Sequence, residues 1–85
     1  MNFEDINFPV YRRYKNNASY FKILNPLQFE EIQRIGSKKV IRQTEAKLYP
    51  EKLFIHDLVY NFKEMAEEIT EKEYLLLRDW NPKKH

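Results

Sequence analysis

Residues 40–62, VIRQTEAKLYPEKLFIHDLVYNF, contain the change of hydrophobic period that decides the fold. Before Pro50 the apolar residues alternate with polar ones, which is the pattern of strands with one buried face. After Pro50 they fall at positions 54, 55, 58, 59 and 62, which is the spacing of one helical face. Strands followed by helices predict the α+β class. We expect an antiparallel sheet of three to four strands in the N-terminal half, with two to three C-terminal helices packed on one of its faces.

The length and composition indicate one domain. The chain has 85 residues, of which 42% are hydrophobic and 33% charged, so it is too apolar for a disordered segment. We expect a single domain over 1–85, with a frayed tail at 81–85 because Pro82 disfavours helical geometry in the residue before it.

The first hairpin is predicted from the Asn16-Asn17 pair between two apolar runs, 10–15 and 18–24. Asparagine tolerates the positive φ that a tight hairpin turn requires. In the resulting register Val10 lies opposite Ile23 and Arg12 opposite Phe21 on one face, and Tyr11 opposite Lys22 and Arg13 opposite Tyr20 on the other.

The segment 27–35 fits either a helix or a strand. Asn25, Pro26 and Gly36 would suit the two ends of a helix. As a strand, the segment pairs with 40–48 across a loop at 36–39, which places Ile35 opposite Val40 and Phe29 opposite Ala46. We favour the strand.

Two helices are predicted in the C-terminal half. Pro50 can open the first, whose apolar face runs to Phe62, and a capping box over 70–73 starts the second at Thr70. The intervening residues 63–69 either continue the first helix or form a short extended link. If they are helical, they contribute to one solvated acidic stripe, formed by Glu64, Glu67, Glu68 and Glu71.

The order of these elements resembles that of small uncharacterised bacterial proteins. The shared features are the hairpin, the acidic-aromatic segment, the glycine turn, a strand ending at 46–50 and a helix containing 54–58. The resemblance spans most of the chain and implies no activity.

The sequence offers little that an enzyme needs. It contains no cysteine and one internal histidine, His56, whose neighbour Asp57 points about 100° away on a helix. One glycine cannot build a phosphate-binding loop. We therefore expect no catalytic residues, no metal and no cofactor. The N-terminus lacks an apolar run and no long apolar stretch follows, so we expect a cytoplasmic protein without a membrane segment.

The charge is unevenly distributed, because residues 10–48 hold nine Lys/Arg and three Glu, whereas residues 50–85 hold six Lys/Arg and eight Asp/Glu. Four basic and aromatic residues share one face of the first hairpin: Tyr11, Arg13, Tyr20 and Lys22. Exposed tyrosine and arginine are enriched at protein interfaces, so we expect this face to bind a partner protein or a second copy of the chain. The alternative is single-stranded nucleic acid, held by the cations and stacked on the phenol rings.

Overall fold

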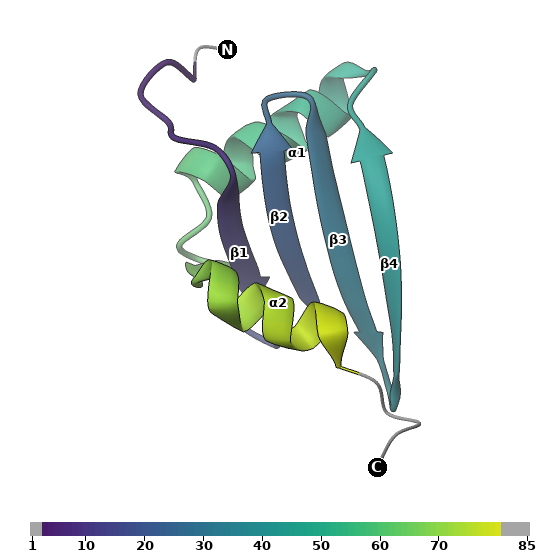
Figure 1. The fold of residues 1–85 in the computed structure, drawn as a ribbon. Helices are drawn as coiled ribbons and strands as arrows, with labels where there is room; N and C mark the ends of the chain where they lie inside the picture. The colour runs from purple at the N-terminus through teal and green to yellow at the C-terminus, as the bar shows by residue number, and fades with distance from the viewer. Residues whose placement is uncertain (1–2, 81–85) are drawn as a thin grey trace.

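The N-terminal half of the chain forms a meander of four antiparallel strands (Figure 1). A computed structural model describes residues 3–80. The strands are β1 (Val10–Tyr14), β2 (Ser19–Asn25), β3 (Gln28–Ile35) and β4 (Lys38–Glu45). The prediction of a strand rather than a helix near 27–35 is confirmed.

The register of the first hairpin is confirmed at all four predicted pairs. Asn17 has φ of 61°, the left-handed conformation that asparagine tolerates. The side chain of Asn16 accepts a hydrogen bond from the amide of Ala18 at 2.9 Å. The turn therefore forms from local asparagine chemistry, and this chemistry sets the pairing of β1 with β2.

The predicted pairing of β3 with β4 is wrong by two residues. Ile35 lies opposite Lys38 and Phe29 opposite Thr44, instead of opposite Val40 and Ala46. The connection is a two-residue turn with φ of 60° at Gly36, so the strands extend beyond the predicted loop at 36–39. A shift of two keeps each residue on its predicted face, because the side-chain period of a strand is two.

The first helix, α1 (Tyr49–Tyr60), starts close to Pro50 and ends before Phe62. The carbonyls of Leu58 and Val59 would accept from residues 62 and 63 if the helix continued. They accept instead from the buried guanidinium of Arg12, at 2.8 and 3.4 Å. This contact from β1 helps to end the helix.

Beyond α1 the chain becomes extended and adds a fifth strand, β5 (Ala66–Glu68), antiparallel to β1. Within residues 3–80 the strand order is β4-β3-β2-β1-β5, so the predicted count of three to four strands is one too low. Of the two alternatives for 63–69, the short extended link is the one that forms, so the helical alternative and the acidic stripe that depended on it are not found there. The backbone of β1 offered a second edge, and pairing there satisfies more backbone groups than a loose link would.

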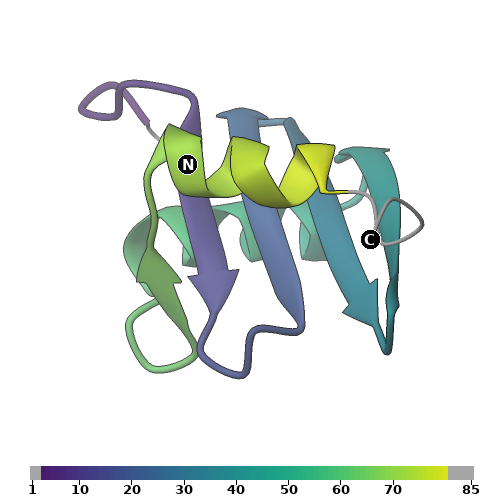
Figure 2. The same cartoon turned by 60° about the horizontal axis from the view of Figure 1, so that its bottom comes forward.

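The two helices lie on opposite faces of the sheet (Figure 2). Helix α1 packs on one face, where the buried residues are Phe21, Ile23, Phe29, Ala46, Ile55, Leu58 and Val59. The second helix, α2 (Glu71–Asp79), packs on the other, where its Tyr74 forms a buried cluster with Tyr11 and Ile32 of the sheet. The expectation that all helices cover one face is therefore wrong, because both faces carry apolar and aromatic residues that need cover.

Helix α2 begins where the capping box predicted. Thr70 is its N-cap, and the Thr70 hydroxyl accepts from the amide of Glu73 at 3.1 Å. Ile69 and Tyr74 lie in the same apolar cluster, as a hydrophobic staple would place them. The frayed tail predicted at 81–85 lies outside the described residues. In the part that is described, neither helix is both long and apolar enough to cross a membrane.

Candidate functional site

The predicted basic-aromatic face lies under and beside α2. Its four residues, Tyr11, Arg13, Tyr20 and Lys22, share one side of the sheet as the register required. Figure 2 shows α2 running across the strands on that side. Each residue therefore has an environment that depends on its position relative to the helix.

Tyr11 lies beneath α2 and is 9% exposed. Its hydroxyl donates to Glu71 Oε2 at 2.8 Å, and its ring centroid lies 5.3 Å from that of Tyr74. Burial, together with the hydrogen bond to Glu71, raises the pKa of Tyr11 to about 12. The ring is thus occupied by the packing of the helix and offers no surface for a stacked base.

Arg13 is engaged by acidic side chains of β5 and α2. Its guanidinium donates to the carboxylate of Glu67 in β5, and lies 3.7 Å from that of Glu73 in α2. These contacts tie β1 to both C-terminal elements and place two carboxylates beside the charge that Arg13 would offer to a phosphate.

Helix α2 separates the other two predicted residues into different grooves. Tyr20 lines a groove of about 370 Å³ together with Arg34, Glu73, Leu76, Leu77 and Trp80. Lys22 lies on the other side of the helix in a larger groove. The structure therefore places the four residues on one face but does not join them into one site.

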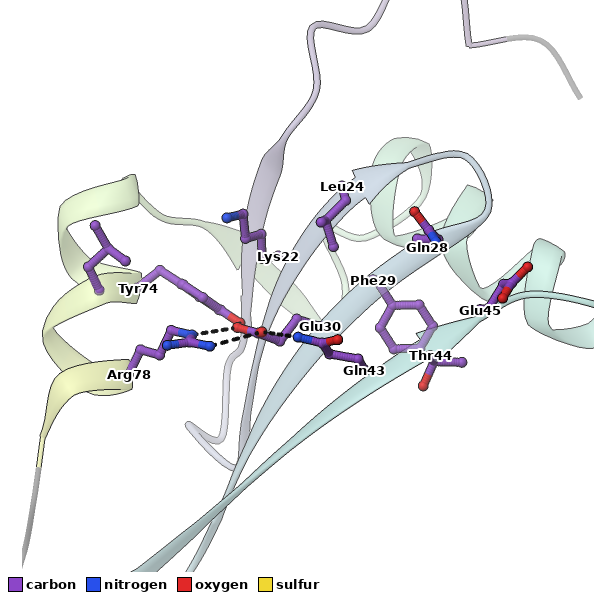
Figure 3. Close-up of a pocket in the computed structure, with 11 residues that line it drawn as sticks. Lys22, Leu24, Gln28, Phe29, Glu30, Gln43, Thr44, Glu45, Tyr74 and Arg78 are labelled. Atoms are coloured by element: carbon purple, nitrogen blue, oxygen red, sulfur yellow. Dashed lines mark hydrogen bonds and ion pairs between the residues drawn. The ribbon is translucent and has the colours of Figure 1, made fainter.

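The larger groove has a volume of about 650 Å³ and lies between α2 and the uncovered part of strands β2 to β4 (Figure 3). We call it the Leu24–Leu75 groove, and its lining residues are Lys22, Leu24, Gln28, Phe29, Glu30, Gln43, Thr44, Glu45, Tyr74, Leu75 and Arg78. Leu24 and Leu75 are each 42% exposed. The groove thus combines exposed apolar residues with polar groups of both charges.

Glu30 forms the polar centre of this groove. Its carboxylate accepts from the hydroxyl of Tyr74 at 2.7 Å, from Arg78 Nε at 2.9 Å and from Gln43 Nε2 at 3.2 Å (Figure 3). Burial by itself would raise the pKa of Glu30, but the hydrogen bonds from these three side chains outweigh it and lower the pKa. Glu30 is therefore ionised and fully partnered, which suits an anchor for α2 better than a proton-transfer group.

Lys22 lies at the rim of the same groove. It is opposite Glu30 in the pairing of β2 with β3, yet Figure 3 shows its ammonium pointing away from the Glu30 carboxylate. Glu30 has its own donors, so the Lys22 charge faces the groove mouth. An acidic group entering the groove would meet it there.

Sequence analysis identified Lys22 but missed the residues that build this groove around it. Glu30 sits in a strand of mixed polar and apolar residues, next to a second glutamate, and nothing nearby in the sequence indicates its partners. Tyr74 and Arg78 are four residues apart and thus share a helix face. That spacing is the only indication of the groove in the sequence, and it does not indicate on which strand this helix face packs.

His56 is held by aromatic side chains of α1 and the N-terminal segment. Its ring centroid lies 6.0 Å from Phe3 and 5.0 Å from Tyr60, and Nδ1 lies 3.7 Å from Asp57. Among residues 3–80, no three His, Cys, Asp or Glu side chains gather closely enough to hold a metal ion. No catalytic arrangement is built around His56 from these contacts.

Comparison with known proteins does not identify a function for this groove. No protein family, no curated protein and no solved structure matches the chain. The resemblance to small bacterial proteins therefore stays a prediction.

Proposed function

We propose that this protein is a non-enzymatic interaction module that binds a partner protein in the Leu24–Leu75 groove. The observation that carries the proposal is the exposure of two leucines on facing walls, over a floor fixed by the Glu30 network. Exposed apolar side chains surrounded by polar and charged groups are a common arrangement at protein interfaces. The partner is expected to insert an apolar side chain between Leu24 and Leu75, with a neighbouring carboxylate near Lys22.

A matched pair of leucine variants tests this proposal. Leu24 lines the groove, whereas Leu27 is 49% exposed in the turn between β2 and β3 and lines a separate notch. Proteins captured from a host lysate by the wild-type chain are compared with those captured by Leu24→Ser and Leu27→Ser. We expect a partner that binds the wild type and Leu27→Ser, but binds Leu24→Ser at least about tenfold more weakly, because an interface anchor is lost.

The binding should depend only moderately on salt, since the anchor is apolar. A partner retained equally by both leucine variants would contradict the proposal. So would a partner lost equally with both, because that result would place the binding surface outside the groove.

Single-stranded nucleic acid is the second candidate, favoured by the groove on the other side of α2. Tyr20, Arg34 and Trp80 line it, which places two aromatic rings and a guanidinium together. If a strand binds there, its affinity should fall with a log–log salt slope of about −0.7 per phosphate contacted. Tyr20→Ala should weaken binding by about 1–3 kcal/mol. Fluorescence anisotropy with labelled oligonucleotides measures both, and absence of binding at low salt would remove this candidate.

A further inference from the structure

The outer edge of β4 is a long row of backbone groups beside which the described residues place no strand. Within 3–80, β4 pairs with β3 on one side only. Its eight residues pair with β3 without a register shift, whereas the opposite edge strand, β5, has only three residues. A long, regular edge is a template for adding another strand.

The hydrogen bonds show which residues direct their backbone groups outward. The amide of Ala46 donates to the carbonyl of Leu27 at 2.7 Å, in line with the β3–β4 register. Hydrogen-bonded and non-hydrogen-bonded pairs alternate along an antiparallel ladder. Counting back from Ala46, every second residue faces β3, so Lys39, Ile41 and Gln43 direct their N–H and C=O groups to the outer edge.

We propose that two copies of the chain associate through β4, antiparallel about a two-fold axis at Ile41. The two sheets then become one continuous sheet. Ile41 pairs with Ile41 of the second copy, and Lys39 with Gln43 of the second copy, each exchanging backbone hydrogen bonds. This edge adjoins the Leu24–Leu75 groove, because Gln43, Thr44 and Glu45 of β4 also line that groove. The proposed dimer uses the backbone edge of β4 and neither Leu24 nor Leu75.

The charges along β4 restrict the register of this pairing. Antiparallel pairing brings the basic start of one strand, Lys38 and Lys39, to the end of the other, where Glu45 lies. Moving the axis to Arg42 would place two arginines opposite each other, and moving it to Val40 would place Arg42 opposite Lys38. Like charges directly opposite destabilise a strand pair. The axis at Ile41 avoids both and places Val40 opposite Arg42.

Lysine often protects an exposed edge, but Lys39 is used elsewhere. Its ammonium donates to the carbonyl of Leu77 at 3.1 Å and to that of Arg78, at the C-terminal end of α2. This contact offsets the negative end of the helix dipole and draws the side chain over the sheet face. The side chain is thus held away from the position where it would block an approaching strand.

Exposed apolar residues lie at the two ends of β4. Ile35 at the hairpin tip is 53% exposed, and Leu48 and Tyr49 at the start of α1 are 68% and 66% exposed. Figure 1 shows the tip and the start of α1 at opposite ends of the strand. Ile35 lies on the α1 face, because it is an even number of residues from Phe29 along β3 and therefore shares the face of Phe29. The two-fold axis brings the tip of each copy beside the α1 start of the other, which adds apolar contact to the backbone pairing.

Sedimentation equilibrium from micromolar to millimolar concentration tests the dimer. The wild type should dimerise, and Ile41→Lys should weaken the dimer at least about tenfold, because it places two ammonium groups on the axis. Leu76→Lys is the matched control, since Leu76 is 65% exposed on α2 and is not part of the β4 edge. It should leave the dimer unchanged.

Amide hydrogen exchange on the unaltered protein gives a second readout that needs no folded variant. The amides of Ile41 and Gln43 should exchange more slowly as concentration rises, while that of Val40, already directed to β3, should not change. A wild-type chain that stays monomeric at millimolar concentration would overturn the proposal. So would a dimer that Leu76→Lys weakens more than Ile41→Lys, whereas a captured partner that Leu24→Ser does not weaken would contradict only the proposed function.

Discussion

At the scale of single residues, Glu30 shows how a buried charge can stabilise a fold. Its side chain is 7% exposed, and three donors from β4 and α2 surround it. Burying a charge is costly unless it is paired and hydrogen-bonded. Here the partners come from elements that meet only in the tertiary structure, so the residue joins α2 to the sheet.

Replacing this carboxylate should destabilise the protein. We expect Glu30→Gln to lower the free energy of unfolding by about 1–3 kcal/mol at pH 7, because charge-assisted hydrogen bonds from Arg78 and Tyr74 are lost. Urea denaturation measures the change. Glu45→Gln, at an exposed position on β4, is the control and should have little effect.

The same variant makes the pH dependence testable. The folded-state pKa of Glu30 is lowered, so its stabilisation is fully present above the ordinary carboxyl pKa of about 4.3 and is lost as pH falls through the lowered value. The difference in unfolding free energy between wild type and Glu30→Gln should therefore shrink in acid. A difference that stays constant from pH 7 to pH 3 would show that Glu30 is not the titrating group.

At the scale of elements, α2 has a start that is set by its own sequence. Thr70 caps the helix, and acidic residues in the first turn, Glu71 and Glu73, suit the positive end of its dipole. Its direction is set by other elements, through Tyr74 on Glu30 and through Lys39 at its last carbonyls.

Removing the cap should cost a measurable amount of stability. We expect Thr70→Ala to lower the free energy of unfolding by about 1 kcal/mol, because the amide of Glu73 loses its acceptor. Thr70→Asp should be nearly neutral, since a carboxylate can accept the same bond. Chemical denaturation of both variants checks this, and equal losses would mean that the hydroxyl does not act as the cap.

At the scale of the whole molecule, one sheet separates two apolar layers. Leu58 is 1% exposed in the α1 layer, and Tyr74 is fully buried in the α2 layer. If the sheet couples both layers into one cooperative unit, the protein should unfold in a single two-state transition.

Single and double variants of the two layers test this coupling. Leu58→Ala should cost about 2–5 kcal/mol through the cavity it leaves, and Tyr74→Phe about 1–3 kcal/mol through the lost hydrogen bond to the Glu30 carboxylate. Because the two side chains lie on opposite faces, the double variant should equal the sum within about 0.5 kcal/mol. Two separate transitions in calorimetry would show instead that the layers unfold independently.

The sequence by itself determined the features that depend on neighbouring residues. The Asn16-Asn17 turn set the first hairpin and its register, Pro50 marked the start of α1 to within one residue, and Thr70 capped α2. Each is a local backbone preference, which acts before distant contacts form. The α+β class followed from hydrophobic periodicity for the same reason.

The tertiary structure decided the rest. Ending α1 at Tyr60 involves Arg12 from β1, and β5 exists because β1 had an unpaired edge. The sequence does not determine which face of the sheet α2 covers, because both faces carry apolar residues. In the structure α2 covers the face of the predicted site, where it buries Tyr11 and separates Tyr20 from Lys22. These outcomes depend on hydrogen bonds and burial between residues far apart in the chain, and no local pattern encodes which partners meet.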